Sequence, residues 1–278
     1  MIRHECRAVP SAALFAALTL ACSSVASAAK IDILANHGAS DPASNAIINA
    51  TDTAGTSNMA DQTNRAVHNL LDNALISLVG GKNSQSAAMV DPSAAYWNSQ
   101  STTPRGDVGI LLDLGGVYEL DALQLFGYNI TDGFPSGLFA DRTPGNLTIW
   151  TATEGSAVTT AGGNLLVSDI SKFMQQGSSQ SMSDPGASAT LGETFLFGGA
   201  SQPAEVGGTT HVVTGSTVAA RYVFFRDLTP IETSVTDLNI VGLGEIQAYG
   251  TAVPELSTLL LGGLTALGLV RLRRRPPA

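Results

Sequence analysis

Few residues in this chain have the type and spacing that covalent chemistry needs. Its four histidines are scattered, and none lies in a Gly-x-Ser-x-Gly turn or a His-Glu-x-x-His segment, the local patterns of serine hydrolases and zinc proteases. The two cysteines, Cys6 and Cys22, both lie in the first 28 residues. Paired carboxylates for glycoside cleavage need not be close in sequence, so a secreted hydrolase stays open as a minor alternative. The pattern favours a protein that is not an enzyme.

The charged residues argue against nucleic acid as a partner. Residues 29–252 hold eight Lys and Arg against 21 Asp and Glu, a net charge of −13. Nucleic acids and anionic lipids both bind basic surfaces, so neither suits this body. Divalent cations need several oxygen ligands, and an exported domain meets calcium at about 10⁻⁴–10⁻³ M, which weak sites can use. Calcium is therefore the candidate cofactor, and simple solubility is the alternative role of the acids.

The first 28 residues are typical of a secretory signal peptide. Arg3 and Arg7 supply the positive start, an apolar run follows, and residues 26–28 (Ala-Ser-Ala) supply the small side chains that a signal peptidase reads. The alternative is a lipoprotein signal ending at Cys22, in which Thr19 stands where an aliphatic residue is expected. Cleavage after residue 28 would remove both cysteines. The exported body would then depend on its core, or on a metal ion, for stability.

The last 26 residues combine a turn, an apolar run and a basic cluster. The turn is Val253-Pro254-Glu255, and fifteen uncharged residues follow it, Leu256–Val270. A helix of that length is about 22 Å long against a bilayer core of about 30 Å, so it is marginal as a permanent span. Positive flanks stay in the cytoplasm, which would leave the body outside the membrane. The basic cluster consists of Arg271, Arg273, Arg274 and Arg275.

This tail resembles the PEP-CTERM sorting signal of exopolysaccharide-producing bacteria, in which a Pro-Glu-Pro motif, a short apolar helix and arginines follow one another. Val253-Pro254-Glu255 occupies the place of the motif, with Leu256 where the second proline is usual. The resemblance implies an exosortase-like membrane protease as a partner and the cell surface or extracellular matrix as the destination. An ordinary C-terminal membrane anchor is the alternative.

Between the two signals, the pattern predicts an all-β body. Ile110–Leu114 is an apolar run that Gly115-Gly116 breaks, and the residues from Leu120 to Phe126 alternate as in a central strand of a sandwich. Only residues 66–78 have partly helical spacing. A Gly/Ser/Thr-rich insertion is expected at about 154–215, with a loop at 178–189. Further strands are expected at residues 31–34, 147–153, 165–167, 195–197, 220–226 and 241–249.

The body also resembles the discoidin-type domain (coagulation-factor type C, galactose-binding-like), which is a jelly-roll β-sandwich. Short pieces carry the resemblance in the family's order. They are Leu71-Asp72-Asn73, Trp97, Asp113-Leu114-Gly115, Tyr128-Asn129, Ala220-Arg221-Tyr222-Val223 and Gly244-Glu245-Ile246-Gln247. The resemblance implies one β-sandwich domain over residues 29–252, between a signal peptide (1–28) and a sorting segment with a short apolar helix (253–278).

Two sites follow from this resemblance. Discoidin-like domains often hold a structural calcium between an early turn and the last strand, which corresponds here to Asp72 and Glu245. Sugar-binding faces of such domains use aromatic side chains on loops at one end, which gives Phe134, Phe139 and Trp97 as candidate ligand-binding residues. We therefore expect a non-catalytic carbohydrate-binding-like module that meets extracellular polysaccharide. The alternative is a structural matrix protein without a discrete ligand.

Overall fold

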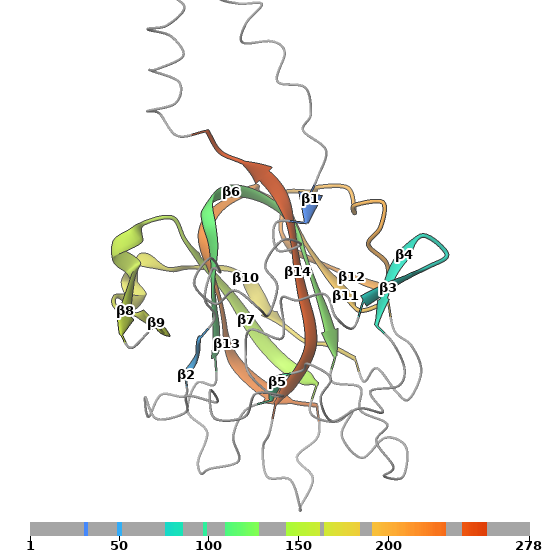
Figure 1. The fold of residues 1–278 in the computed structure, drawn as a ribbon, viewed down its shortest axis with the longest axis horizontal. Helices are drawn as coiled ribbons and strands as arrows, with labels where there is room; N and C mark the ends of the chain where they lie inside the picture. The colour runs from blue at the N-terminus through green and yellow to red at the C-terminus, as the bar shows by residue number, and fades with distance from the viewer. Residues whose placement is uncertain are drawn as a thin grey trace, which may run out of the picture.

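β-Strands make up nearly all of the regular structure (Figure 1). The computed structural model describes residues 31–32, 49–51, 76–85, 97–98, 109–127, 143–161, 164–183, 191–231 and 241–254. The helical structure within these ranges is two short 3₁₀ turns, η4 (Gly155–Ala157) and η5 (Ile170–Lys172). The expected all-β fold is confirmed. The expected signal peptide and nearly all of the sorting segment lie outside the described residues.

Ten strands form one continuous sheet that curves into two facing layers. The first layer contains β1 (Ile31–Asp32), β5 (Trp97–Asn98), β14 (Gly242–Ala252), the second half of β6 (Gly109–Gly127), β11 (Glu193–Phe197) and β12 (Thr209–Thr214). The second layer contains β2 (Asn49–Thr51), the first half of β6, β13 (Val218–Pro230), β7 (Pro144–Ala152) and β10 (Met174–Gln180). Two hairpins lie outside this sheet: β3 (Ile76–Val79) with β4 (Lys82–Gln85), and β8 (Val158–Ala161) with β9 (Asn164–Val167).

The long strand β6 connects the two layers. In its first half Leu112 lies opposite Val223 of β13, and in its second half Leu123 lies opposite both Ala248 of β14 and Phe195 of β11. The strand bends at Gly115, whose φ of +75° is one that residues with a side chain rarely adopt. The expectation that the glycine pair ends a strand was wrong, because β13 pairs with β6 on both sides of the bend and β14 pairs with β6 after it.

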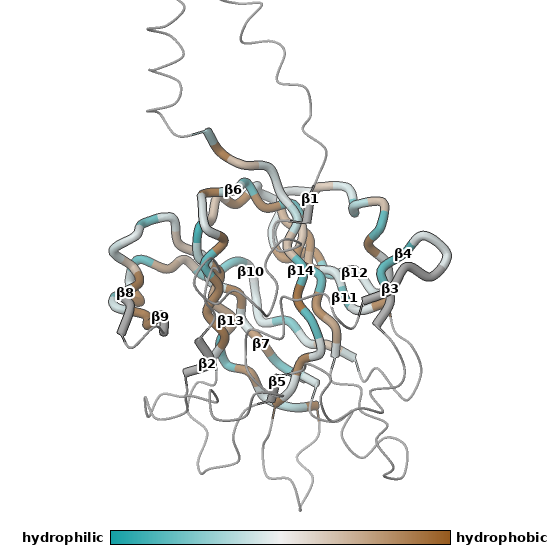
Figure 2. Tube along the Cα trace, in the orientation of Figure 1, coloured by the Kyte–Doolittle hydropathy of each residue, from teal (hydrophilic) through white to brown (hydrophobic). Residues whose placement is uncertain are grey.

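The main core lies between the two layers. Alternate residues of the central strands point into it, among them Ile110, Leu123, Ile149, Phe195, Val223, Phe225 and Ile246. The residues between them point outward but are also buried, since loops and hairpins cover both outer faces. Figure 2 accordingly shows long apolar runs along the central strands. Burial on both faces explains why the alternation in the sequence is imperfect.

The β3–β4 hairpin covers the outer face of the first layer. Lys82 Nζ donates to the carbonyl oxygens of Ala204 and Val206, each at 2.7 Å. Asn83 Nδ2 donates to Gln247 Oε1 at 2.9 Å and to the Tyr249 hydroxyl at 2.8 Å. These bonds join a hairpin near the start of the chain to the last strand, β14.

The β8–β9 hairpin and η5 cover the outer face of the second layer. Leu111 of β6, Phe224 of β13 and Trp150 of β7 lie side by side across three strands. Leu165 of β9 and Phe173 pack onto this row, and the Phe173 and Phe224 rings meet edge to face at 5.8 Å. The two outer faces are therefore covered in different ways. Hydrogen bonds hold the β3–β4 hairpin on the first layer, and apolar contacts hold the β8–β9 hairpin on the second.

Most of the expected strands are confirmed. Those at 147–153, 220–226 and 241–249 correspond to β7, β13 and β14, and those at 165–167 and 195–197 correspond to β9 and β11. The expectation of helical structure at residues 66–78 was wrong at the end of this range. Residues 76–79 form a strand that pairs with residues 82–85 across a two-glycine turn. The loop expected at 178–189 was wrong at its start, since Ser178–Gln180 belongs to β10.

The polar stretch 154–215 supplies three strands of the main sheet, β10, β11 and β12, in addition to the β8–β9 hairpin. Strand β10 is rich in Gln and Ser, yet it pairs with β7 from Met174 to Gln180. Its buried Gln176 donates to Thr151 Oγ1 at 2.8 Å. Backbone pairing and satisfied side-chain amides hold this strand in place of a strong apolar pattern.

Candidate functional site

One end of the sandwich collects the strand termini that flank the expected ligand-binding loops. Strands β6 and β13 end there, and β7 and β14 begin there, since Pro144 pairs with Pro230 and Gly127 with Leu243. We call this the loop end. At the opposite end, β6 bends at Gly115 and β14 finishes at Ala252, and we call it the tail end (Figure 1).

Of the three expected ligand-binding aromatics, Trp97 lies in the described part of the chain. It belongs to β5 and pairs with Leu243 of β14, at the loop end. Phe134 and Phe139 lie outside the described residues, in the segment that joins β6 to β7. The roles of all three residues stay predictions.

Of the two expected calcium ligands, only Glu245 lies in the described part of the chain. Glu245 lies in β14 close to the loop end, and its side chain is 0% exposed. A buried carboxylate is costly unless a proton, hydrogen bonds or a cation compensate it. Asp72 lies outside the described residues, and within those residues no three His, Asp or Glu side chains lie together as a metal site requires. Calcium binding stays a prediction.

A mixed polar and aromatic cluster lies on the outer face of the second layer, in the middle part of β7 and β13. The Arg226 guanidinium carbon lies 5.1 Å from the centre of the Trp150 ring. Trp150 Nε1 donates to Thr148 Oγ1 at 3.0 Å, and Thr148 Oγ1 donates to Asp227 Oδ2 at 2.7 Å. We call these four residues the Trp150 cluster. They present an indole, a guanidinium, a carboxylate and a hydroxyl on one face.

The register of β7 and β13 produces this cluster. Trp150 lies opposite Phe224, and Thr148 lies opposite Arg226, so their side chains share the outer face. The register then shifts after Arg226, where Asp227 takes a φ of +56°, a conformation that Asp tolerates better than most residues. Asn146 Nδ2 supports this bend by donating to the Asp227 carbonyl oxygen at 3.0 Å.

The sequence analysis missed these four residues, although part of the signal was present. Thr148 and Trp150 are two apart in one strand, as are Phe224 and Arg226 in another, so each pair shares a face. The sequence did not reveal that β7 and β13 are neighbours. Without that pairing, a tryptophan and an arginine 76 positions apart are unrelated.

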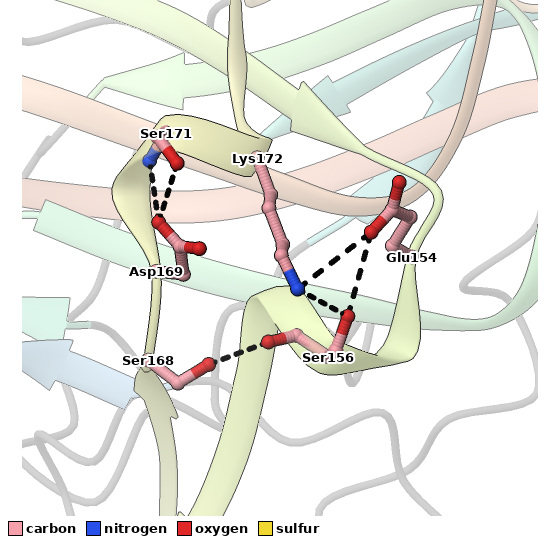
Figure 3. A network of polar contacts seen from close by, with 6 residues as sticks. All are labelled: Glu154, Ser156, Ser168, Asp169, Ser171 and Lys172. Carbon is pink, nitrogen blue, oxygen red and sulfur yellow. Dashed lines mark hydrogen bonds and ion pairs between the residues drawn. The ribbon is translucent and has the colours of Figure 1, made fainter.

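An exposed polar network surrounds η4 and η5 at the far end of β7 (Figure 3). Lys172 Nζ donates to Ser156 Oγ at 2.5 Å and lies 3.7 Å from Glu154 Oε2. Ser168 Oγ donates to the Ser156 carbonyl oxygen at 2.7 Å. The network closes the base of the β8–β9 hairpin.

A second part of this network caps η5. Asp169 Oδ1 accepts hydrogen bonds from the Ser171 hydroxyl at 2.6 Å and from the Ser171 backbone N–H at 3.0 Å. Both bonds lower the pKa of the Asp169 carboxyl, and the bond from the Ser171 hydroxyl has the larger effect. The arrangement is a typical cap at the start of a helical turn.

The described histidine, His211, lies in a strand and not in a loop. Its Nε2 is 2.6 Å from Glu193 Oε2, and its ring stacks on Phe195 with centres 4.8 Å apart. Glu193 Oε1 accepts the backbone N–H of Ser183 at 2.5 Å. Parallel pairing of β11 and β12 places Phe195 opposite His211, which accounts for the contact. The pair links β11, β12 and the segment after β10. His37 and His68 lie outside the described residues.

Comparisons with known proteins give remote structural likenesses. No family model and no curated protein matches the chain. Similar solved structures include the C-terminal domain of a chitobiase from Bacteroides fragilis, with 11% identity and a TM-score of 0.39 over 74% of this chain and 92% of that one. Another is chitosan-binding module 1 of a chitosanase/glucanase from Paenibacillus sp. IK-5, with 11% identity and a TM-score of 0.39 over 79% and 99%.

A third is the family 32 CBM of NanJ from C. perfringens, solved in complex with galactose, with 9% identity and a TM-score of 0.36 over 73% and 91% of the two chains. With TM-scores of 0.39 or less, these likenesses assign neither a family nor a ligand to this chain. Within the described residues, no helix has the length and apolarity needed to cross a bilayer. The expected membrane segment, from Leu256 on, lies outside them.

Proposed function

We propose that this protein is an exported, non-catalytic surface protein whose β-sandwich binds polysaccharide on the outer face of its second layer. The Trp150 cluster carries this proposal. An aromatic ring offers a flat apolar surface to the C–H groups of a sugar ring, while guanidinium and carboxylate groups form strong, charge-assisted hydrogen bonds with its hydroxyls. Trp150, Arg226 and Asp227 are half-buried, so they are both positioned by the fold and accessible to a ligand.

The charge of the body narrows the class of polysaccharide. With a net charge of −13 over residues 29–252, the domain repels polyanions at long range. We therefore favour neutral glycans over uronate-rich or sulfated ones. The Asp227 carboxylate beside the single guanidinium of the cluster balances its charge, which also favours a neutral glycan.

Export and sorting form the second part of the proposal. A signal peptide at residues 1–28 would direct secretion, and the segment 253–278 would hold the protein in the membrane until an exosortase-like protease acts on it. The order of turn, apolar run and arginines supports this proposal. The position of the motif supports it too, since β14 ends at Ala252 and both Val253 and Pro254 are exposed.

A structural calcium ion at the loop end is the third part. Glu245 would supply one carboxylate from β14, and Asp72 is the expected second ligand. Glu245 is completely buried, and a cation is one of the groups that can compensate a buried negative charge, together with hydrogen bonds and a proton. Bound there, calcium would supply positive charge and oxygen-ligand geometry that order the loop end, and no chemical step.

The binding proposal is tested with the purified full-length protein against neutral and anionic polysaccharides by isothermal titration calorimetry. Arg226→Gln should weaken binding of the preferred neutral glycan by about tenfold or more, since a charged hydrogen bond contributes about 1.5–3 kcal/mol. Arg221→Gln is the matched control, because it makes the same change in the same strand near the tail end, and it should leave affinity within about twofold.

Two results would contradict the binding proposal. Equal losses in the two variants would show that the Trp150 cluster is not the site. The absence of saturable binding by the wild-type protein would favour the structural matrix protein without a discrete ligand.

A further inference from the structure

The last strand of the sandwich leads directly into the sorting motif. β14 runs from Gly242 at the loop end to Ala252 at the tail end. Val253, the first residue of the motif, still belongs to the fold, because its backbone N–H donates to the Val117 carbonyl oxygen at 2.9 Å. Val117 lies just after the bend of β6. The chain therefore leaves the domain at a fixed point of the tail end.

The N-terminal strand enters the domain at the same end. In β1, Ile31 pairs with Gly250 and Asp32 with Tyr249, close to the end of β14 (Figure 1). The expected signal-peptide cleavage site after residue 28 lies two residues before β1. Both ends of the body thus lie at the tail end, and the loop end lies opposite.

The chain between β14 and the expected membrane segment is too short to act as a linker. From Ala252 to Leu256 a fully extended chain covers at most about 14 Å. The headgroup region on each side of the hydrocarbon core is roughly 5–8 Å thick. The apolar run, about 22 Å as a helix, is also shorter than the core of about 30 Å, which draws its flanks inward. The tail end must then lie at, or just above, the headgroups.

We propose that the domain stands upright on the membrane, with its tail end against the lipid headgroups and its loop end directed outward. This inference rests on the proposed function, since it requires the tail to be inserted in a bilayer. At roughly 3.3 Å per residue, the eleven residues of β14 span about 36 Å, which is how far the loop end would stand from the headgroups. The outer face that carries the Trp150 cluster would then stand clear of the membrane surface.

Charge favours the upright position over one in which the domain lies on its side. The body carries a net charge of −13, so contact of a broad face with anionic headgroups is repulsive. At the tail end, Arg221 balances Asp113 through two hydrogen bonds of 3.1 Å, and the exposed Glu119 adds a negative charge. The upright position brings only the charges of this end close to the headgroups, instead of those of a whole face.

The test uses the full chain in proteoliposomes that contain lipids with a spin-labelled headgroup, which quenches nearby fluorophores. Cys6→Ser and Cys22→Ser provide a background without thiols. A fluorophore is then attached through Glu119→Cys, an exposed position at the tail end, or through Thr229→Cys, an exposed position at the loop end. Quenching should be several-fold stronger at position 119 than at position 229. A water-soluble quencher should affect both labels equally in detergent.

A linker variant provides the matched control. Twenty Gly/Ser residues inserted between Ala252 and Val253 have a root-mean-square length of about 25 Å and free the domain from the surface. Quenching at position 119 should then fall to the level at position 229. Equal or reversed quenching in the protein without the linker overturns the upright placement while leaving sorting intact. If the protein fails to float with the vesicles, the tail is not a membrane segment, and the sorting proposal falls together with the placement.

Discussion

The two outer faces of the sandwich are closed in different ways. On the first layer, the β3–β4 hairpin covers neutral polar side chains, and Asn83, Gln124, Gln247 and Tyr249 are all buried. On the second layer, the β8–β9 hairpin covers an apolar row, and Trp150, Arg226 and Asp227 of the Trp150 cluster stay half-buried beside it. Both faces thus combine polar and aromatic groups, but only the second leaves them within reach of solvent.

The difference in exposure between the two faces predicts that polar groups on one contribute to stability and those on the other to binding. Buried polar groups have lost their water and must find partners inside the protein, so the contacts of Asn83 hold the fold together. Half-exposed polar groups keep part of their hydration and can exchange it for a ligand at little cost to folding. We therefore expect substitutions on the first face to change stability and those on the second face to change binding.

The largest effect on stability should come from Asn83→Leu. This change removes the donor that Gln247 Oε1 and the Tyr249 hydroxyl share, at a buried position. The free energy of unfolding should fall by about 2–3 kcal/mol in urea denaturation. Asn146→Leu makes the same substitution on the half-exposed second face, where a loss of about 1 kcal/mol or less is expected. Equal losses would contradict the distinction between the faces.

Glu245→Gln tests calcium binding at the loop end, which both faces share. If Glu245 binds calcium weakly, 10 mM calcium should stabilise the wild-type protein by about 1.4–2.7 kcal/mol, and the variant much less. Thermal melting with calcium and with a chelator measures the difference. Magnesium serves as the control cation, because it demands a tighter octahedral site. A calcium response that survives in the variant would place the ion elsewhere.

Thr148→Val sharpens the comparison on the second face. The nearly isosteric change removes the hydroxyl that accepts from Trp150 and donates to Asp227. Glycan affinity should fall about three- to tenfold, because the indole and the carboxylate lose their mutual orientation, while unfolding free energy should change by less than about 1 kcal/mol. A loss of stability with unchanged affinity would make the Trp150 cluster a structural element like that around Asn83.

The smallest effect should come from Asp169→Asn, in the exposed network of Figure 3. The folded state lowers the pKa of this carboxyl, mainly through the Ser171 hydroxyl. The ionised Asp169 carboxylate therefore stabilises the folded state above the unfolded pKa of about 4. This contribution is lost as pH falls through the lower folded pKa. The variant should be slightly less stable than the wild type at pH 7, and the difference should vanish near pH 2. A difference that persists in acid would have another cause.

Local patterns were enough to locate most central strands. The apolar alternation of β7, β13 and β14 depends on neighbours two residues apart, so it is visible in any short window. Strands such as β10 were not recognisable, because their Gln- and Ser-rich sequences gain order from pairing with β7. The bend at Gly115 was misread for the same reason, since a glycine pair looks alike whether the ladder stops or continues.

The sequence by itself determined the acidic character of the body, the lack of catalytic motifs, the alternation of its main strands, and the order of turn, apolar run and arginines at the tail. Only the tertiary structure decided that Trp150 meets Arg226, that Glu193 meets His211, and that β14 finishes at the end opposite the loops. The physical reason is that alternation arises from the geometry of a single strand. Contacts between strands depend on which strands pair and in what register, and the whole core selects that pairing.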